Sequence, residues 1–104
     1  MWFATTLWGI DPARVNLGVG YYSISGSSWR SISKMCPNVP VASNVCNGTV
    51  FVGKKMNWEL GQLAQAQNLG GVFPWMMSYD AADPGNELLP YLVRGLNGEP
   101  MMGL

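Results

Sequence analysis

The side chains that could carry out acid–base or nucleophilic chemistry are few in this sequence. Histidine is absent from all 104 residues, which removes histidine general bases, histidine-based catalytic triads and most zinc sites. Two cysteines cannot form a structural zinc site on their own. The carboxylic acids that could transfer a proton are six: Asp11, Glu59, Asp80, Asp83, Glu87 and Glu99.

The positions of these acids favour structural roles. Glu59 falls on a predicted helix face and Glu87 at a predicted helix start, and we expect both side chains to be solvated. Asp83 precedes a proline and is typical of a turn or a helix cap. Asp80, Asp83 and Glu87 do not have the spacing of an EF-hand loop, so turn chemistry is the better interpretation than calcium binding. We therefore expect no metal site and no cofactor.

The two cysteines and a nearby sequon indicate an oxidising compartment. Cys36 and Cys46 are close enough in sequence to close a short loop, worth ~2–3 kcal/mol. Asn47 begins the N-glycosylation sequon Asn-Gly-Thr in the same polar stretch. The apolar start of the chain lacks a basic region and a cleavage site, so it is a poor signal peptide. The cysteines and the sequon together predict a secreted or extracellular protein.

Composition limits the class of partner. The formal net charge is zero, and charged residues make up 12% of the chain, against about 25% in an average domain. This balance argues against nucleic-acid binding, and no apolar run approaches the roughly 20 residues of a membrane span. Hydrophobic residues reach 48%, so the chain has few polar groups to cover its surface. We expect it to be part of something larger, by assembly or by truncation.

Hydrophobic patterns predict an α/β chain with two strands. Two apolar strands with a helix between them are typical of a parallel βαβ unit, although a two-stranded parallel sheet alone is not a credible domain. The clearest helix has apolar residues at three- and four-residue steps (Met56, Leu60, Leu63 and Ala64). The last helix tolerates Pro90 only in its first turn. The expected elements are a helix end over 1–8, a strand over 15–22, a long loop over 23–49, a helix over 54–67, a buried strand over 69–77 and a helix over 87–95.

Two motifs in this order resemble glycoside hydrolase family 18, the chitinase-like family. Residues 15–23 read V-N-L-G-V-G-Y-Y-S, similar to the family's seventh strand, and residues 70–80 read G-G-V-F-P-W-M-M-S-Y-D, similar to its eighth. The resemblance implies a partial (β/α)8 TIM barrel, with residues 1–104 as a C-terminal fragment holding the last two strand–helix units. Gly18 and Gly20 then lie within a strand and form no phosphate-binding loop.

The resemblance also implies a sugar site at the carboxyl ends of the strands. By resemblance, Trp75 is the floor on which a pyranose ring stacks, and Tyr22 stands at the mouth of the neighbouring strand. Trp29, in the long loop, is a candidate second stacking surface, and the alternative is that it packs the loop onto the domain. Tyr79 is a further substrate-binding candidate. The ligand would be a chitin-like oligosaccharide of β-1,4-linked N-acetylglucosamine; the alternative is that these aromatics are ordinary core residues.

The chain departs from the family in its catalytic residues. The catalytic motif D-x-x-D-x-D-x-E, whose Glu is the general acid, does not occur. Residues 77–80 match the family's sixth-strand motif M-x-Y-D, which we interpret as coincidental because they follow the eighth-strand pattern directly. Ile24 lies near the place of an Arg common in the family. We therefore expect the chain to be inactive alone and to need the remainder of a barrel or further copies of itself. The alternative is a structural or assembly module without sugar binding.

Overall fold

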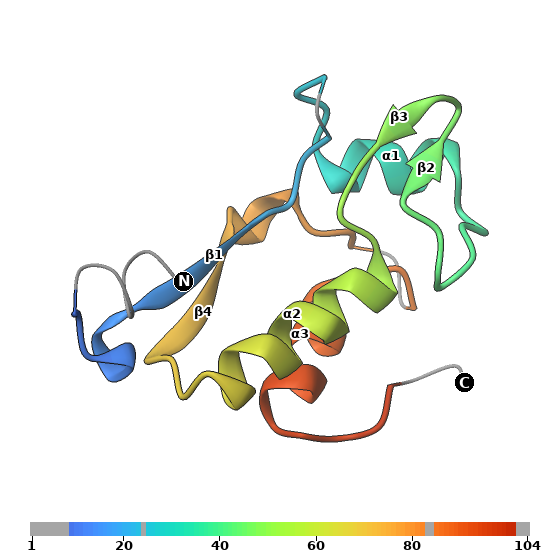
Figure 1. Cartoon of the computed structure of the whole chain (residues 1–104). Helices are drawn as coiled ribbons and strands as arrows, with labels where there is room; N and C mark the ends of the chain where they lie inside the picture. The colour runs from blue at the N-terminus through green and yellow to red at the C-terminus, as the bar shows by residue number, and fades with distance from the viewer. Residues whose placement is uncertain (1–8, 24, 83–84, 102–104) are drawn as a thin grey trace.

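The structure is a computed structural model that describes residues 9–23, 25–82 and 85–101. A pair of parallel strands lies beside two packed helices, and a smaller lobe follows the first strand (Figure 1). The expected helix end over 1–8 falls outside the described residues. The main elements are β1 (Asn16–Gly20), α2 (Lys54–Ala66), β4 (Gly71–Trp75) and α3 (Leu89–Leu96), and the short 3-10 turns are η2 (Pro12–Arg14) and η3 (Met77–Tyr79).

The two strands pair in parallel, as the βαβ pattern predicts. The register runs from Asn16 opposite Gly71 to Gly20 opposite Trp75. Both strands are shorter than expected. Beyond Gly20 only the Tyr21 amide continues the ladder, donating to the Trp75 carbonyl oxygen over 2.9 Å, before the chain turns into the lobe.

The strands are not covered on both faces, which corrects the expectation of a fully buried strand over 69–77. Val19 of β1 and Tyr21, directly after the strand, point into the core. The alternate positions are Gly18 and Gly20, and on this second face the paired strand exposes the ring of Phe73. Because side chains alternate between the two faces of a sheet, one face packs on the helices and the other stays open among the described residues.

Helices α2 and α3 lie where the patterns predict, but α2 buries a different face. Met56 and Leu63, expected in the core, are exposed, whereas Asn57 and Gly61 are buried. Ala64 is buried and Leu60 packs against the core, as expected.

The reason for the different face is a close crossing of the two helices. A Cβ on Gly61 would collide with the Leu92 carbonyl oxygen of α3, and a Cβ on Gly95 would collide with the Trp58 carbonyl oxygen of α2. The backbones approach so closely that only glycine fits at these points. The contact therefore selects small residues, which a count of large apolar side chains overlooks.

The stretch expected to be an aperiodic loop forms a compact lobe. It contains the expected hairpin and disulfide, together with a helix that the pattern does not predict. Ser28 caps that helix, its hydroxyl accepting a hydrogen bond from the Ser31 amide over 3.3 Å. The lobe's elements are α1 (Trp29–Met35), β2 (Val45–Cys46) and β3 (Thr49–Val50).

One core connects the lobe to the sheet and helices. It contains residues from all three parts of the molecule. The core residues are Val19, Tyr21, Trp29, Ile32, Cys46, Phe51, Ala81, Leu88 and Leu92.

None of the helices in the described part of the chain is both long and apolar enough to cross a membrane.

Candidate functional site

Two exposed aromatic side chains lie at the carboxyl ends of the parallel strands. Trp75 is the last residue of β4, and 60% of it is exposed. Its register partner in β1 is Gly20, two residues before Tyr22, which is 45% exposed. The peptide bond after Trp75 is cis. Parallel pairing thus brings both predicted aromatics to the same end of the sheet.

Glycines in β1 let aromatic rings lie against the strand on its open face. A Cβ on Gly18 would come within 2.9 Å of the Phe73 ring, and one on Gly20 within 3.0 Å of the Tyr22 ring. A larger residue at either position would have to push the ring away. Phe73, which the sequence analysis did not single out, therefore shares the open face with Trp75; its position two residues earlier in the same strand is the signal that could have found it.

Trp29 is not a stacking surface for a ligand, contrary to the expectation. It is 1% exposed, and its ring lies 4.8 Å from that of Phe51, centroid to centroid. Its indole N–H donates to the Asn86 carbonyl oxygen over 2.7 Å. Trp29 therefore does what the alternative interpretation described: it packs the lobe onto the rest of the domain.

Tyr79 is half-buried and packs against the core from η3. Its amide donates to the Met76 carbonyl oxygen over 2.8 Å, within the turn that follows Trp75. Any contact between Tyr79 and a ligand remains a prediction.

Asp80 has the turn role that the sequence analysis expects, and it also caps the start of α3. One carboxylate oxygen accepts from the amides of Ala81 and Leu88, over 2.8 and 2.7 Å, and the other accepts from Leu89 over 3.0 Å. These contacts hold the start of α3, where amides lack partners within the helix. The Asp80 carbonyl oxygen also accepts from the Arg30 guanidinium over 3.1 Å, which connects the lobe to the end of β4.

Glu59 and Asp11 also have solvated or structural positions. Glu59 forms an exposed ion pair with Lys55 at 4.0 Å, consistent with a solvated face. Asp11 accepts from the Ala13 amide and caps η2. Asp83 lies outside the described residues. Within the described part of the chain, no three His, Cys, Asp or Glu side chains gather as a metal site would require.

Two buried groups have shifted pKa values. Burial, and secondarily the negative charge of Asp80, raises the pKa of the Tyr21 phenol. Burial lowers the pKa of the Lys54 ammonium, whose Nζ donates to the Asn86 side-chain oxygen over 3.3 Å. Tyr21 belongs to the core, and Lys54 is 7% exposed at the start of α2, so neither group belongs to the open face.

The disulfide predicted from the sequence is present. Cys36 at the end of α1 is bonded to Cys46 of β2, ten positions away. The tip of the β2–β3 hairpin follows directly, with Asn47 exposed and in the left-handed region at φ 48°. The sequon is therefore accessible, while glycosylation itself remains a prediction.

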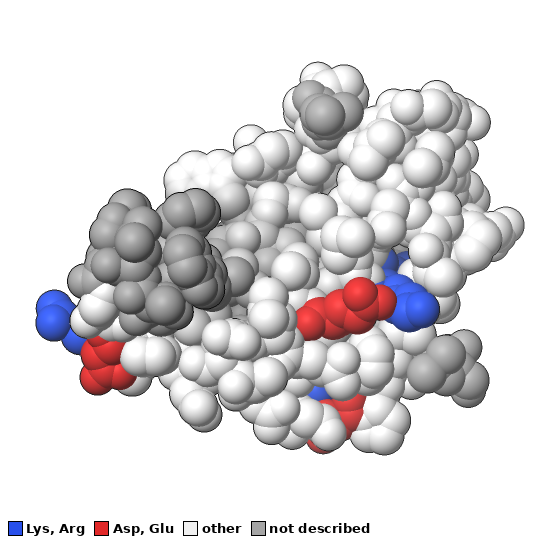
Figure 2. All heavy atoms as spheres, viewed as in Figure 1, with Lys and Arg blue, Asp and Glu red and all other residues white. Residues whose placement is uncertain are grey.

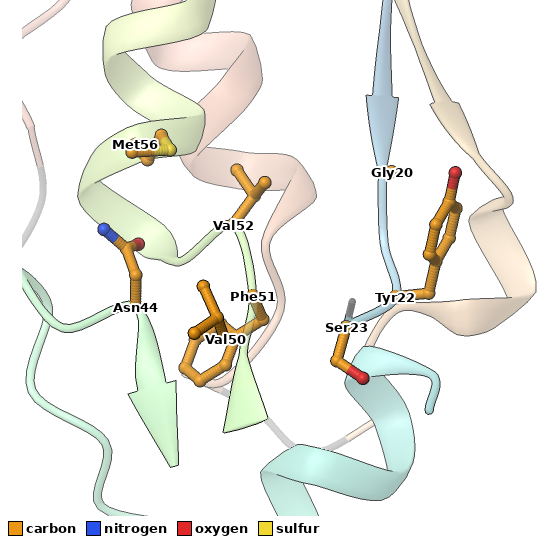
Figure 3. Close-up of a pocket in the computed structure, with 8 residues that line it drawn as sticks. All are labelled: Gly20, Tyr22, Ser23, Asn44, Val50, Phe51, Val52 and Met56. Carbon is orange, nitrogen blue, oxygen red and sulfur yellow. The ribbon is translucent and has the colours of Figure 1, made fainter. Parts of the chain in front are cut away.

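A pocket of about 380 Å³ lies between the end of β1 and the lobe. Figure 3 shows Gly20, Tyr22 and Ser23 on one side of the opening, and Val50, Val52 and Met56 on the other. Its lining is mostly apolar; Phe51 and Asn44 complete it. Charged side chains are few and scattered on the face of the molecule in Figure 2. The pocket therefore suits apolar groups and offers little to an ion.

Comparison with known proteins supports the fold. No family model and no curated protein matches the sequence. Among solved structures, a chitinase from Bacteroides thetaiotaomicron is similar, with a TM-score of 0.80 at 16% identity. The match covers 97% of this chain but only 36% of that chitinase. The chain thus has a chitinase-like α/β fold and spans about a third of the length of the protein it matches.

Proposed function

We propose that this chain is the C-terminal part of a barrel of the glycoside hydrolase 18 type, contributing part of a cleft for N-acetylglucosamine polymers. The observation that carries the proposal is the position of Trp75 and Tyr22, exposed at the carboxyl ends of adjacent parallel strands. Binding sites in barrels of this class lie at that end. The chitinase-like fold and the two strand motifs support the same assignment.

Trp75 would provide the main stacking surface. An indole ring offers a broad apolar face, and the exposed part of Trp75 can lie against the apolar face of a pyranose. Tyr22 would border the same sugar from the neighbouring strand, and Tyr79 would contribute from the turn after Trp75. Hydrolysis would need a general acid supplied from elsewhere, because the sequence has no D-x-x-D-x-D-x-E motif.

The test is a chitin pull-down with matched variants. We expect the chain to bind chitin beads without hydrolysing a chromogenic chitobioside, and Trp75→Ala to weaken binding at least tenfold. Met77→Ala is the control, because Met77 is also 60% exposed, two residues further along, and has no ring to stack. Equal retention of both variants, or no retention of the unmodified chain, would contradict the proposal and favour an assembly module without sugar binding.

A secreted location is part of this proposal. The Cys36–Cys46 disulfide and the exposed sequon at Asn47 support it, because disulfides persist in oxidising compartments. The remainder of the cleft would come from a partner, either the rest of a barrel or further copies of this chain.

A further inference from the structure

The sequon at Asn47 lies at the tip of a hairpin that is held closed at its base. Asn47 and Gly48 have positive φ angles, 48° and 79°, as a tight two-residue turn requires, and they join the paired residues Cys46 and Thr49. Cys46, directly before the sequon, is 4% exposed and is bonded to Cys36. The Asn47 side chain faces solvent and has room for a glycan, but the backbone that carries it is bent and fixed.

Attachment of a glycan requires a more open chain than this hairpin. In the reaction the Asn47 side-chain nitrogen attacks C1 of an oligosaccharide carried on a lipid pyrophosphate. A nitrogen–carbon bond replaces the bond from C1 to oxygen, the nitrogen loses a proton, and the lipid pyrophosphate leaves. The transferase must enclose both Asn47 and Thr49, so it takes the sequon as an extended segment. A tight turn with a disulfide one residue away cannot enter such a site.

The order of residues along the chain makes closure of the lobe compete with this reaction. Helix α1 and both cysteines precede Asn47, so all of them leave the ribosome before the sequon does. A loop of about ten residues closes within about 10–100 ns, and oxidation of the thiols then takes seconds or longer. Synthesis adds about 5–20 residues per second. Oxidation of Cys46 and glycosylation of Asn47 can therefore occur in the same interval.

During that interval the disulfide is the main restraint on the hairpin. Strands β2 and β3 have two residues each, and an isolated two-stranded hairpin is marginally stable in water. Leu88 and Leu92, which complete the core around the lobe, belong to the start of α3 and to α3 itself, much later in the chain. An unbonded lobe can thus open its sequon, whereas a bonded lobe keeps it bent.

We propose that the Cys36–Cys46 bond controls glycosylation of Asn47, because the transferase acts on the chain only before this bond closes. The secreted chain is then a mixture of two forms, both with the disulfide, of which one carries a glycan and the other does not. The inference rests on the secreted location that is part of the proposed function. It does not depend on the sugar site, and its test uses no chitin.

The test compares glycan occupancy in chains that share the same sequon. The chain is expressed behind a cleavable signal peptide in a eukaryotic secretory host, and peptide mass spectrometry measures Asn47 in cells and medium together. Cys36→Ser prevents the bond and leaves residues 45–49 unchanged. We expect it to raise the ratio of glycosylated to unglycosylated chains at least about threefold. Gly95→Ala is the control: its added carbon collides with the Trp58 carbonyl oxygen in the α2–α3 crossing, and the cysteine pair stays intact. Its ratio should equal that of the unmodified chain.

A second measurement uses the unmodified chain. Brief treatment of the cells with a dithiol reductant keeps the cysteines open during synthesis and should raise occupancy by a similar factor, while Asn47→Gln identifies the mass shift that belongs to this sequon. Three outcomes would overturn this inference alone: full occupancy of the unmodified chain, equal ratios in that chain and in Cys36→Ser, or an equal rise in Gly95→Ala. A glycan on none of the chains would overturn the use of the sequon itself, and with it the support that Asn47 gives to a secreted location.

Discussion

Replacing Tyr21 by phenylalanine is expected to stabilise the protein. The Tyr21 ring is 1% exposed, and its hydroxyl has no hydrogen-bond partner among the described residues. An unpaired buried hydroxyl costs ~1–3 kcal/mol of folding free energy, whereas the ring itself fits its site. Tyr21→Phe keeps the ring and removes the unpaired group, so its free energy of unfolding at pH 7 should exceed that of the unmodified chain by about 1 kcal/mol or more.

The difference should grow at alkaline pH. Burial and the charge of Asp80 raise the pKa of Tyr21 in the folded state, while an unfolded tyrosine ionises near pH ~10. Above that pH the folded chain binds more protons than the unfolded one, so the stability due to the neutral phenol is lost as pH rises. The advantage of Tyr21→Phe should therefore widen by about 1.4 kcal/mol between pH 9 and pH 11. The lowered pKa of Lys54 acts in the opposite direction, but equally in both proteins, and cancels in the difference.

Urea unfolding followed by tryptophan fluorescence at three pH values measures both effects. Two outcomes would refute the reasoning. A variant less stable than the unmodified chain by 1 kcal/mol at pH 7 would show that the hydroxyl has a partner. A difference that stays constant between pH 9 and pH 11 would show that the phenol ionises as readily in the folded chain as in the unfolded one.

Two further stability predictions concern the disulfide and the helix crossing. Removing the disulfide by replacing Cys36 and Cys46 with serine should cost about 2.7 kcal/mol, because the bond joins residues ten positions apart; urea midpoints check this, and unchanged midpoints would contradict it. Gly95→Ala should cost about 1–3 kcal/mol, because the added carbon meets the Trp58 backbone of the facing helix. Gly71→Ala is the control, since its added carbon would have only an ordinary contact at 3.4 Å, and equal losses in thermal melts would argue against the close crossing.

The sequence predicted the elements that have a regular pattern of residue types. Runs of apolar, β-branched and aromatic residues located β1 and β4, and apolar residues at three- and four-residue steps located α2. The rarity of proline inside helices placed Pro90 correctly in the first turn of α3. The disulfide followed from the spacing of two cysteines alone.

The patterns missed a backbone contact between two helices and a helix that depends on a serine cap. Hydrophobic periodicity weighs side chains, so it could not reveal that Gly61 lies at the backbone contact between α2 and α3. The serine-rich stretch before Trp29 hid a helix in which the Ser28 side chain satisfies the Ser31 amide. Without that helix Trp29 seemed free to meet a ligand, whereas the helix turns its ring into the core.

The position of the lobe has a consequence for how proteins of this fold can diverge. The lobe occupies the connection between the end of β1 and the start of α2 at Lys54. The entropy cost of a connection grows only with the logarithm of its length, so doubling it costs roughly 0.6 kcal/mol. Insertions at exposed positions of the lobe, such as the hairpin tip at Asn47 and Gly48, would leave the shared core, the β1–β4 register and the glycine crossing in place. Such changes would nevertheless alter the surface beside Tyr22 and Trp75, so the lobe is where evolution could change what reaches the strand ends without redesigning the sheet.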